Sequence, residues 1–289
     1  MNWFEKMKTG LKSRVKREIP QGIWVKCKLC GHANYEMALE RNHWICPECT
    51  YHYAIGHQKY VELLIDDGTF VETETEVAPV DPLKFKGYRD KIKDGRRQSD
   101  GKESVHTGVG RIGGHDVALA VMDTRYIMGT LGGATGEKIC RLIDQAIAEG
   151  RTLIIICQSG GARMQESAYS LMQMARISAK LKQLSRSGLL YIAILTDPTY
   201  GGVTASFAML GDIALAEPGA RIGFAGQTVI QQFLGTDAPL PEGFQVAETV
   251  LEHGFIDRIV PRDHMAAELA RLIALLAPSR DQSPDRAWG

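Results

Sequence analysis

Two short turns, Gln158-Ser-Gly-Gly-Ala-Arg163 and Tyr200-Gly-Gly-Val-Thr204, decide how this chain folds. Each turn follows an apolar run that is typical of a buried strand, residues 152–157 and residues 189–195. Each turn also precedes a stretch with the pattern of a helix. The unit of strand, glycine pair and helix therefore occurs twice, and repeated units of this kind in one core indicate an α/β fold.

The glycine pairs Gly160-Gly161 and Gly201-Gly202 suit turns that approach a ligand closely. Glycine adopts positive φ without a steric penalty, and the first amides of a following helix have no acceptor within that helix. Such amides can stabilise negative charge on a carbonyl oxygen, as enolate formation requires. We therefore predict that these four glycines are the catalytic groups of an active site. The alternative is that the pairs serve only for tight packing of helix on sheet.

Length and composition describe an ordinary globular protein with room for one large core and an added module. The 289 residues are 44% hydrophobic and 24% charged, and the formal net charge is zero. No apolar run approaches the ~18 residues of a membrane span, and the N-terminus lacks the apolar segment of a secretory signal. We expect a cytoplasmic protein that does not bind membranes. The balanced charge argues against a dedicated nucleic-acid binder.

The most specific local pattern pairs Cys27-Lys-Leu-Cys30 with Cys46-Pro-Glu-Cys49. The two-residue spacing lets both thiolates of a pair reach one ion, and four thiolates leave no open coordination position. The array therefore predicts a structural zinc ribbon over residues 23–57, since cytosolic arrays of this kind usually bind metal instead of forming disulfides. The remaining cysteines, Cys140 and Cys157, lie on apolar faces and are assigned to core packing.

The rest of the chain divides into four further segments by composition and periodicity. Residues 1–22 predict a basic amphipathic arm and residues 58–103 a connecting segment. Residues 104–277 predict the main core, and residues 278–289 a disordered tail. Within the connecting segment, residues 83–103 are polar, basic and interrupted by glycine, which indicates a surface loop.

Two glycine-rich stretches resemble nucleotide-binding motifs only formally. Gly108-Val-Gly-Arg-Ile-Gly113 precedes a strand at residues 117–122 where a dinucleotide fold needs a helix, so it predicts a hairpin. Residues 128–138 form a loop before a predicted helix but lack P-loop spacing. Gly132 and Gly133 of this loop are candidates to present amides to a substrate phosphate or thioester.

No side chain has the context of a catalytic nucleophile. The residues around Ser159 lack the first glycine of G-x-S-x-G, and no histidine has a convincing triad partner. The catalytic mechanism is therefore expected to depend on backbone donors.

Downstream, the helix over residues 162–185 carries an apolar stripe that we assign to the core. Its members are Met164, Leu171, Met172, Met174 and Ile177. Further predicted elements are a helix at 203–210, strands at 212–216 and 221–224, helices at 228–234 and 245–253, a strand at 256–260 and a helix at 264–276.

Several separate motifs within about residues 1–262 carry a family resemblance. They are Trp24-Val-Lys-Cys27, Asp81-Pro-Leu-Lys-Phe85, Ser159-Gly-Gly-Ala-Arg-Met-Gln-Glu166, Ser170-Leu-Met-Gln-Met-Ala175, Thr196-Asp-Pro-Thr199, Gly201-Gly-Val-Thr-Ala-Ser-Phe-Ala-Met-Leu-Gly-Asp212, Ile222-Gly-Phe-Ala-Gly226 and Leu251-Glu-His-Gly254. Together they resemble the family of carboxyltransferase beta subunits of bacterial and plastid acetyl-CoA carboxylase. The resemblance implies a crotonase-like (ClpP/crotonase) superhelical α/β core with an N-terminal zinc ribbon.

The resemblance also implies an activity. Such a subunit transfers the carboxyl group of carboxybiotin to acetyl-CoA, which gives malonyl-CoA for fatty-acid synthesis. Biotin is carried by a partner, the biotin carboxyl carrier protein, and the subunit works with a carboxyltransferase alpha subunit in an α2β2 complex. Two oxyanions develop in this reaction, on biotin and on the thioester enolate. By analogy Gly160-Gly161 would serve one acyl or biotin carbonyl, and Gly201-Gly202 the adjoining wall.

Two further residues and two loops bear on the substrate. Arg163 would either hold a phosphate of coenzyme A or brace its turn, and Tyr200 stands where the family usually has Met. Residues 129–133 depart from the usual Gly-Gly-Ser-Met-Gly, and residues 234–241 replace a charged linker. Because these changes lie where acyl-CoA and biotin should bind, a specialised paralogue acting on another acyl-CoA is an alternative. A biotin-linked decarboxylase subunit, a zinc-ribbon nucleic-acid-binding module and a non-catalytic scaffold also stay open.

Overall fold

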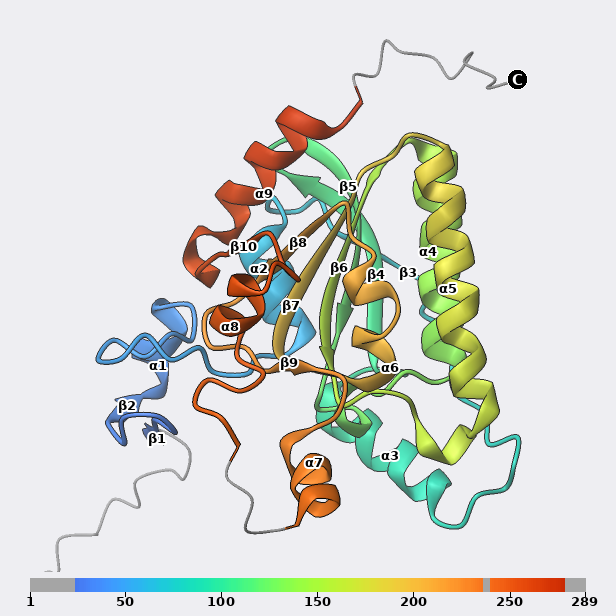
Figure 1. Cartoon of the computed structure of the whole chain (residues 1–289). Helices are drawn as coiled ribbons and strands as arrows, with labels where there is room; N and C mark the ends of the chain where they lie inside the picture. Colours follow the sequence, from blue (N-terminus) through green and yellow to red (C-terminus); the bar gives the residue numbers. More distant parts are fainter. Residues whose placement is uncertain (1–23, 236–239, 279–289) are drawn as a thin grey trace, which may run out of the picture. The chain divides into compact units, whose positions relative to one another are not determined.

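The computed structural model describes residues 24–235 and 240–278 (Figure 1). The arm predicted for residues 1–22 and all but the first residue of the predicted tail, residues 279–289, lie outside the described residues. Within the described part, no helix combines the length and the apolar character that a membrane crossing needs.

The chain divides into two compact units, residues 1–51 and residues 52–289. The predicted connecting segment, residues 58–103, belongs to the second unit. The described part of the first unit has a small antiparallel sheet and one short helix, and its buried apolar side chains are few. A unit with so small a core usually needs a metal or a cross-link to be stable. Its elements are β1 (Trp24–Lys26), β2 (Ala33–Tyr35) and α1 (Glu36–Arg41).

The second unit is built on one mixed sheet. Its strand order in the described residues is β10-β8-β7-β6-β5-β4-β3, with β9 paired to β7. Pairing is parallel from β5 to β10 and antiparallel between β3, β4 and β5. Every residue of β6 is buried, because helices cover both faces of the sheet here. The strands are β3 (Val71–Thr73), β4 (Val105–Ile112), β5 (His115–Met122), β6 (Thr152–Ser159), β7 (Tyr191–Tyr200), β8 (Ile213–Ala216), β9 (Ile222–Gly223) and β10 (Arg258–Ile259).

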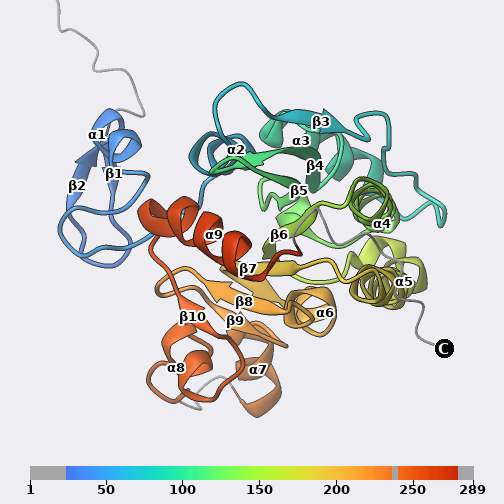
Figure 2. The same ribbon diagram turned by 90° about the horizontal axis from the view of Figure 1, so that it is seen from above.

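Helices α4 and α5 lie on one side of the sheet and α9 lies on the other (Figure 2). The main hydrophobic core fills the space between the sheet and α4 and α5, and it includes Cys140 and Cys157 as predicted. The helices of this unit are α2 (His57–Leu64), α3 (Tyr88–Ser99), α4 (Gly133–Glu149), α5 (Ala168–Arg186), α6 (Gly201–Thr204), α7 (Gln227–Leu234), α8 (Ala247–Glu252) and α9 (Arg262–Leu276), with 3-10 helices at Ile127–Gly129, Met164–Glu166 and Phe207–Met209.

The predicted α/β fold is confirmed, as is the hairpin at residues 108–122. Strands β4 and β5 pair antiparallel through a turn in which Gly113 and Gly114 have φ of 55° and 82°. The surface loop predicted for residues 83–103 is wrong in part, because helix α3 occupies most of it. That helix buries Tyr88 and Ile92 on one face, and its many charges lie on the others. The high polarity of the whole segment hid this periodicity.

The assignment of the apolar stripe on α5 to the core is wrong for three of its five members. Ile177 is buried and Met174 is packed against the core. Met164, Leu171 and Met172 are 81%, 52% and 64% exposed. The helix also begins later than predicted. A 3-10 turn occupies residues 164–166, so the apolar residues at this end do not share one buried face.

Other boundaries shift by a few residues. The predicted helix at residues 203–210 is two short helices, α6 and a 3-10 turn, and β7 extends through Tyr200. Strands β9 and β10 are shorter than the predicted runs at 221–224 and 256–260. Helices α7, α8 and α9 lie where helices were predicted.

Candidate active site

The two glycine turns lie against each other at the carboxyl ends of neighbouring parallel strands. Ser159 at the end of β6 pairs with Thr199 near the end of β7, so both turns leave the same edge of the sheet. A Cβ added to Gly161 would lie 3.3 Å from the Cα of Gly201, and one added to Gly201 would lie 3.1 Å from the Cα of Gly161. These two glycines have φ of 114° and 59°. Both position and conformation therefore require glycine.

The amides of the first glycine pair are already hydrogen-bonded within the protein. The Gly160 N–H donates to the Met128 carbonyl at 2.8 Å, and the Gly161 N–H donates to Ser159 Oγ at 3.0 Å. This geometry contradicts the prediction that these two amides are free to hold an oxyanion. The second pair fits the role better, because α6 begins at Gly201 and first-turn amides lack acceptors within their helix.

A third backbone segment, residues 128–133, runs along the first turn. The Leu131 N–H donates to the Gly161 carbonyl and the Arg163 N–H donates to the Leu131 carbonyl, both at 2.9 Å. Gly129 has φ of 65°, and a Cβ added there would lie 2.0 Å from the Gln158 carbonyl oxygen. The glycine therefore permits close contact between this loop and the end of β6.

Gly132 and Gly133 face protein groups, which corrects their prediction as substrate-binding amides. The Gly132 N–H donates to Thr135 Oγ1 at 3.1 Å, and the Gly133 N–H donates to Glu166 Oε2 at 2.6 Å. A Cβ added to Gly132 would lie 2.6 Å from Arg163 Nη1. The sequence predicted close approach at these glycines correctly, but the approaching groups are buried side chains of the same chain.

Of the two roles proposed for Arg163, bracing the turn matches its contacts. The side chain is fully buried, so the guanidinium is not available to a phosphate of coenzyme A. It donates to Glu103 Oε2 at 2.9 Å, to the Thr130 carbonyl at 2.7 Å and to Tyr88 Oη at 3.2 Å. Burial opposes ionisation of Glu103, but the Arg163 guanidinium outweighs it and lowers the pKa of that carboxyl. The substrate-binding assignment of Arg163 is therefore corrected.

This buried network contains groups that sequence reasoning missed. Tyr88 Oη donates to Glu166, whose carboxylate also accepts from Gly133 and Arg163. Burial raises the pKa of Tyr88 above its ordinary value, so it stays a donor. Glu166 stands three residues after Arg163 in the quoted motif and could have been noticed. Glu103 had no signal, because it ends a segment that was predicted to be a loop.

Tyr200, the remaining predicted substrate contact, is the last residue of β7. Its side chain is 9% exposed, and burial raises the pKa of its phenol. The Tyr200 carbonyl oxygen lies 3.4 Å from a Cβ added to Gly161. The residue therefore borders both turns, and its contact with a substrate stays a prediction.

Exposed apolar side chains adjoin the turns or follow the first turn along the chain. Met128 is 57% exposed, and its carbonyl holds the Gly160 amide. Phe224 is 73% exposed, and its carbonyl oxygen lies 3.7 Å from a Cβ added to Gly201. With Met164, Leu171 and Met172 of the 3-10 turn and α5, these residues form what we call the apolar rim. Exposed apolar surface of this kind marks interaction sites.

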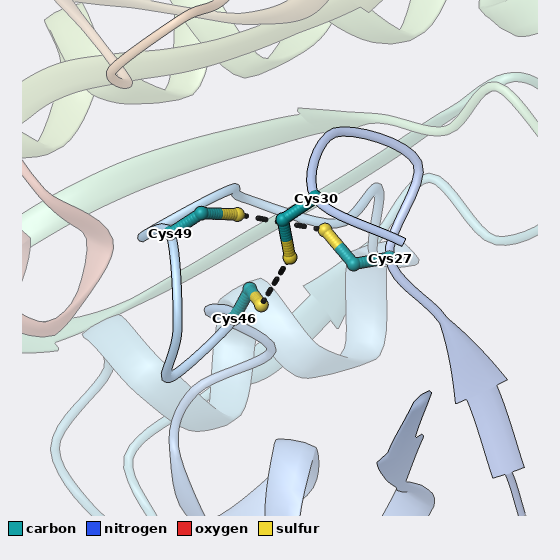
Figure 3. Close-up of side chains that lie close together, drawn as sticks. All are labelled: Cys27, Cys30, Cys46 and Cys49. Atoms are coloured by element: carbon teal, nitrogen blue, oxygen red, sulfur yellow. Dashed lines mark hydrogen bonds between the residues drawn. The ribbon is translucent and has the colours of Figure 1, made fainter. Parts of the chain in front are cut away.

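The four cysteines predicted as metal ligands lie together in the first unit (Figure 3). Their sulfur atoms all lie within 4.8 Å of one another, with Cys27 Sγ 3.6 Å from Cys49 Sγ and Cys30 Sγ 3.8 Å from Cys46 Sγ. Disulfides would need sulfurs about 2.05 Å apart. Zinc bound tetrahedrally at about 2.3 Å per sulfur separates its ligands by about 3.8 Å, so this arrangement fits zinc.

The chain was compared with known proteins. Residues 58–287 match the family model described as "Carboxyl transferase domain". The acetyl-coenzyme A carboxylase carboxyl transferase subunit beta of Chlorobium chlorochromatii is 46% identical over 279 residues, which cover 96% of this chain and 99% of that protein. The same subunit of Clostridium botulinum (strain Kyoto) is 50% identical and covers 88% of each chain. A Clostridium tetani protein named as subunits beta/alpha is 50% identical, and the chain spans 44% of its length.

Solved structures show the same fold at lower identity. A Pseudomonas malonate decarboxylase hetero-tetramer in complex with malonate matches with a TM-score of 0.65 and 23% identity, over 78% of this chain and 84% of that one. Transcarboxylase 12S matches with a TM-score of 0.66 and 23% identity, over 83% of this chain and 43% of that one. The expected crotonase-like α/β core is thereby confirmed. The family model and the relatives that match from end to end show that the chain belongs to the carboxyl transferase family.

Proposed function

We propose that the chain is the beta subunit of an acetyl-CoA carboxylase carboxyltransferase, which transfers a carboxyl group from carboxybiotin to acetyl-CoA and forms malonyl-CoA. The observation that carries this proposal is the 46% identity to the Chlorobium beta subunit over almost the whole of both chains. That match covers both the four-cysteine unit and the core. The malonate decarboxylase structures share only the fold, at 22–23% identity, so they do not favour a decarboxylase to the same degree.

The chain's own contribution to catalysis is a rigid wall of backbone. We infer that amides at the start of α6, at Gly201 and Gly202, stabilise the thioester oxygen as negative charge develops on it. The Gly160-Gly161 turn fixes the position of that wall, because the Gly160 N–H and the Gly161 carbonyl are bonded to the loop at residues 128–131. Carboxybiotin, brought by a partner protein, supplies the activated carboxyl group.

The loop at residues 129–133 does not favour a different acyl-CoA. Its glycines contact Gln158, Thr135 and Glu166 of the chain itself. A change in this loop therefore alters internal packing before it alters a substrate contact. Acetyl-CoA is accordingly the proposed acyl substrate.

The apolar rim supports a partner at the active site. We propose that the carboxyltransferase alpha subunit covers these side chains, in an α2β2 complex, and supplies the facing wall of the site. The biotin carboxyl carrier protein then delivers biotin between the subunits. Apolar groups such as Met164, at 81% exposure, are rarely left in water as a cluster unless a partner covers them.

The first unit is proposed to bind one structural zinc ion through Cys27, Cys30, Cys46 and Cys49. Desolvation opposes ionisation of Cys27, but hydrogen bonds from the backbone amides of Cys30 and Leu29 lower its pKa to about 6. Amide donors of this kind favour the thiolate form that zinc requires.

The test is formation of malonyl-CoA from acetyl-CoA and carboxybiotin by the chain together with its cognate alpha subunit. Gly202→Val is the informative variant, because even a Cβ there would lie 2.8 Å from Met174 Sδ and 3.4 Å from the Ala162 Cβ. Activity should fall at least a hundredfold in this variant while complex formation and zinc content persist. Ala179→Val, at an exposed position on α5, is the matched control and should keep activity within twofold. No malonyl-CoA from the wild-type complex would refute the proposal.

A further inference from the structure

The second glycine turn follows an irregularity in the sheet. Strands β6 and β7 pair in regular parallel register as far as Cys157, but the next pair, Ser159 with Thr199, is shifted. Three residues of β7, at 196–198, therefore lie opposite a single residue of β6. Extra residues of this kind are common beside active sites, where they redirect the chain that follows. Here the chain that follows is the second glycine turn.

Two buried threonine hydroxyls link the strands at this irregularity. Thr196 Oγ1 donates to the Cys157 carbonyl of β6 at 2.9 Å. Thr199 Oγ1 lies 2.9 Å from the same carbonyl oxygen and 2.9 Å from the Thr196 carbonyl oxygen, so these two acceptors share its single proton. Both side chains are fully buried, and water does not compete for these bonds. Side-chain hydroxyls therefore hold β7 to β6 where the backbone register shifts.

The main chain of Thr199 is bonded on both sides as well. Its N–H donates to the Arg221 carbonyl, directly before β9, at 2.8 Å. Its carbonyl accepts from Thr204 Oγ1 at 2.8 Å. Thr204 is the last residue of α6, so this bond closes the segment at residues 200–203 between two fixed ends. That segment contains both glycines of the second turn.

The glycines of this turn cannot orient their own peptide planes, because glycine has no side chain and the widest range of φ and ψ. The close approach of Gly201 to Gly161 is a van der Waals contact. Such a contact limits a distance but does not fix the direction of an N–H bond. Hydrogen bonds weaken steeply when donor and acceptor are misaligned, so they do restrain direction. The bonds of Thr199 and Thr204 are of this kind.

We propose that Thr199 and Thr204 are positioning residues for carboxyl transfer, and that their hydroxyls hold the Gly201 and Gly202 amides at the angle that the developing oxyanion needs. The inference rests on the proposed function, in which these amides stabilise the thioester oxygen. Their hydrogen bonds to that oxygen strengthen as negative charge develops on it. A tilted amide therefore weakens binding of the transition state more than binding of acetyl-CoA. Loss of either hydroxyl should lower kcat and leave KM almost unchanged.

The experiment compares variants of the full chain in complex with its cognate alpha subunit. Thr199→Val keeps the shape of the side chain and removes the hydroxyl, while Thr196 still bonds the Cys157 carbonyl. In this variant kcat for malonyl-CoA formation should fall at least tenfold, and KM for acetyl-CoA should stay within twofold. Thr199→Ser keeps the hydroxyl and loses only a methyl group, so its kcat should stay within threefold of wild type. Thr204→Val and Thr204→Ser should behave in the same way.

Thr107 offers a matched control. Its side chain is equally buried, and its hydroxyl donates to the Thr73 carbonyl at 3.0 Å, which joins β4 to β3. Thr107→Val therefore removes a hydrogen bond of the same kind outside both glycine turns. It should lower the urea midpoint of unfolding about as much as Thr199→Val does, yet keep kcat within twofold of wild type. If Thr199 served stability alone, the two variants would have the same kcat.

Hydrogen exchange followed by mass spectrometry gives a readout that needs no turnover. Residues 200–204 should exchange at least fivefold faster in Thr199→Val than in wild type, and at the wild-type rate in Thr107→Val. Unchanged exchange in Thr199→Val, a kcat within twofold of wild type, or serine variants as slow as the valine variants would overturn the proposal. If the wild-type complex forms no malonyl-CoA, the proposed function fails instead. The exchange rates then still decide whether the hydroxyls hold the turn.

Discussion

At the scale of single residues, the site is defined by Arg163 more than by the glycines around it. Its guanidinium bonds Glu103 and Thr130, and its backbone amide bonds Leu131. One buried side chain thereby fixes the loop at residues 128–133 against the first glycine turn. The forked shape of arginine matters here, since lysine has no second nitrogen with which to reach both groups.

Replacing Arg163 with lysine should therefore destabilise the protein strongly. Breaking a buried ion pair typically costs about 3–5 kcal/mol, and we expect a loss of that order in the free energy of unfolding in urea. Arg176→Lys is the matched control, because Arg176 is 46% exposed and pairs with Glu137 at the surface. Its loss should stay below about 1 kcal/mol. Equal losses in the two variants would contradict the bracing role.

Asp123 gives a second expectation at this scale, in the pH dependence of stability. Burial alone would raise its pKa, but hydrogen bonds from His57 and Arg125 outweigh burial and place the pKa well below its ordinary value. A carboxyl whose pKa is lower in the folded state contributes stability above its unfolded pKa and loses it as pH falls through the folded pKa.

The free energy of unfolding should accordingly decline as pH falls below about 4, near the unfolded pKa of aspartate. In Asp123→Asn the decline should be shallower, although the variant is less stable at neutral pH. Denaturant titrations between pH 3 and pH 7 measure both slopes. Parallel curves for the two proteins would show that Asp123 does not carry the effect.

At the scale of elements, the strands and the hairpin were predictable. Runs of apolar residues indicate buried strands, and glycines mark the turns between them. Helix α3 was not predictable, since its two buried apolar side chains, Tyr88 and Ile92, are outnumbered by charges. The α5 stripe failed for a different reason. Periodicity identifies an apolar face, but it does not say whether the same chain or a partner covers that face.

The four-cysteine unit gives the expectation for metal removal. With few buried apolar side chains among residues 24–51, the unit should lose protection from hydrogen exchange when a chelator removes zinc. The core strands, β6 among them, should keep theirs. Metal analysis should find one zinc per chain in the wild type, much less in Cys46→Ser, and an unchanged amount in Cys140→Ser, whose thiol lies in the core. Full zinc content in Cys46→Ser would exclude this ligand set.

At the scale of the whole molecule, the exposed part of α5 and the loops beside it are expected to bind the alpha subunit. Met172→Glu places a charge where an apolar contact is proposed, and it should weaken the complex at least tenfold in sedimentation velocity. Leu275→Glu makes the same change on α9, at a side chain that is 66% exposed. It should leave the complex intact. If both variants bind equally well, the apolar rim is not the interface.

The sequence predicted that two glycine turns belong to one site, and the pairing of β6 with β7 places them together. It could not show which amides are free. In the first turn that depends on the Met128 carbonyl, which comes from another part of the fold, and on the orientation of the Ser159 hydroxyl. Residue types and spacing predict where a backbone can approach a neighbour, whereas the identity of the neighbour is a property of the tertiary structure.

The contact between Gly161 and Gly201 limits how this enzyme can be redesigned. A methyl group on either glycine would lie only 3.1–3.3 Å from the other backbone, and both residues have positive φ, so substitution at either position is strained and is a poor way to reshape the proposed acyl site. Mutant libraries aimed at new acyl substrates would gain most from sparing both glycines and diversifying the bordering side chains, of which Tyr200 is the nearest candidate. The same contact joins two strand ends into one mechanical unit, so a displacement of either turn has to move the other.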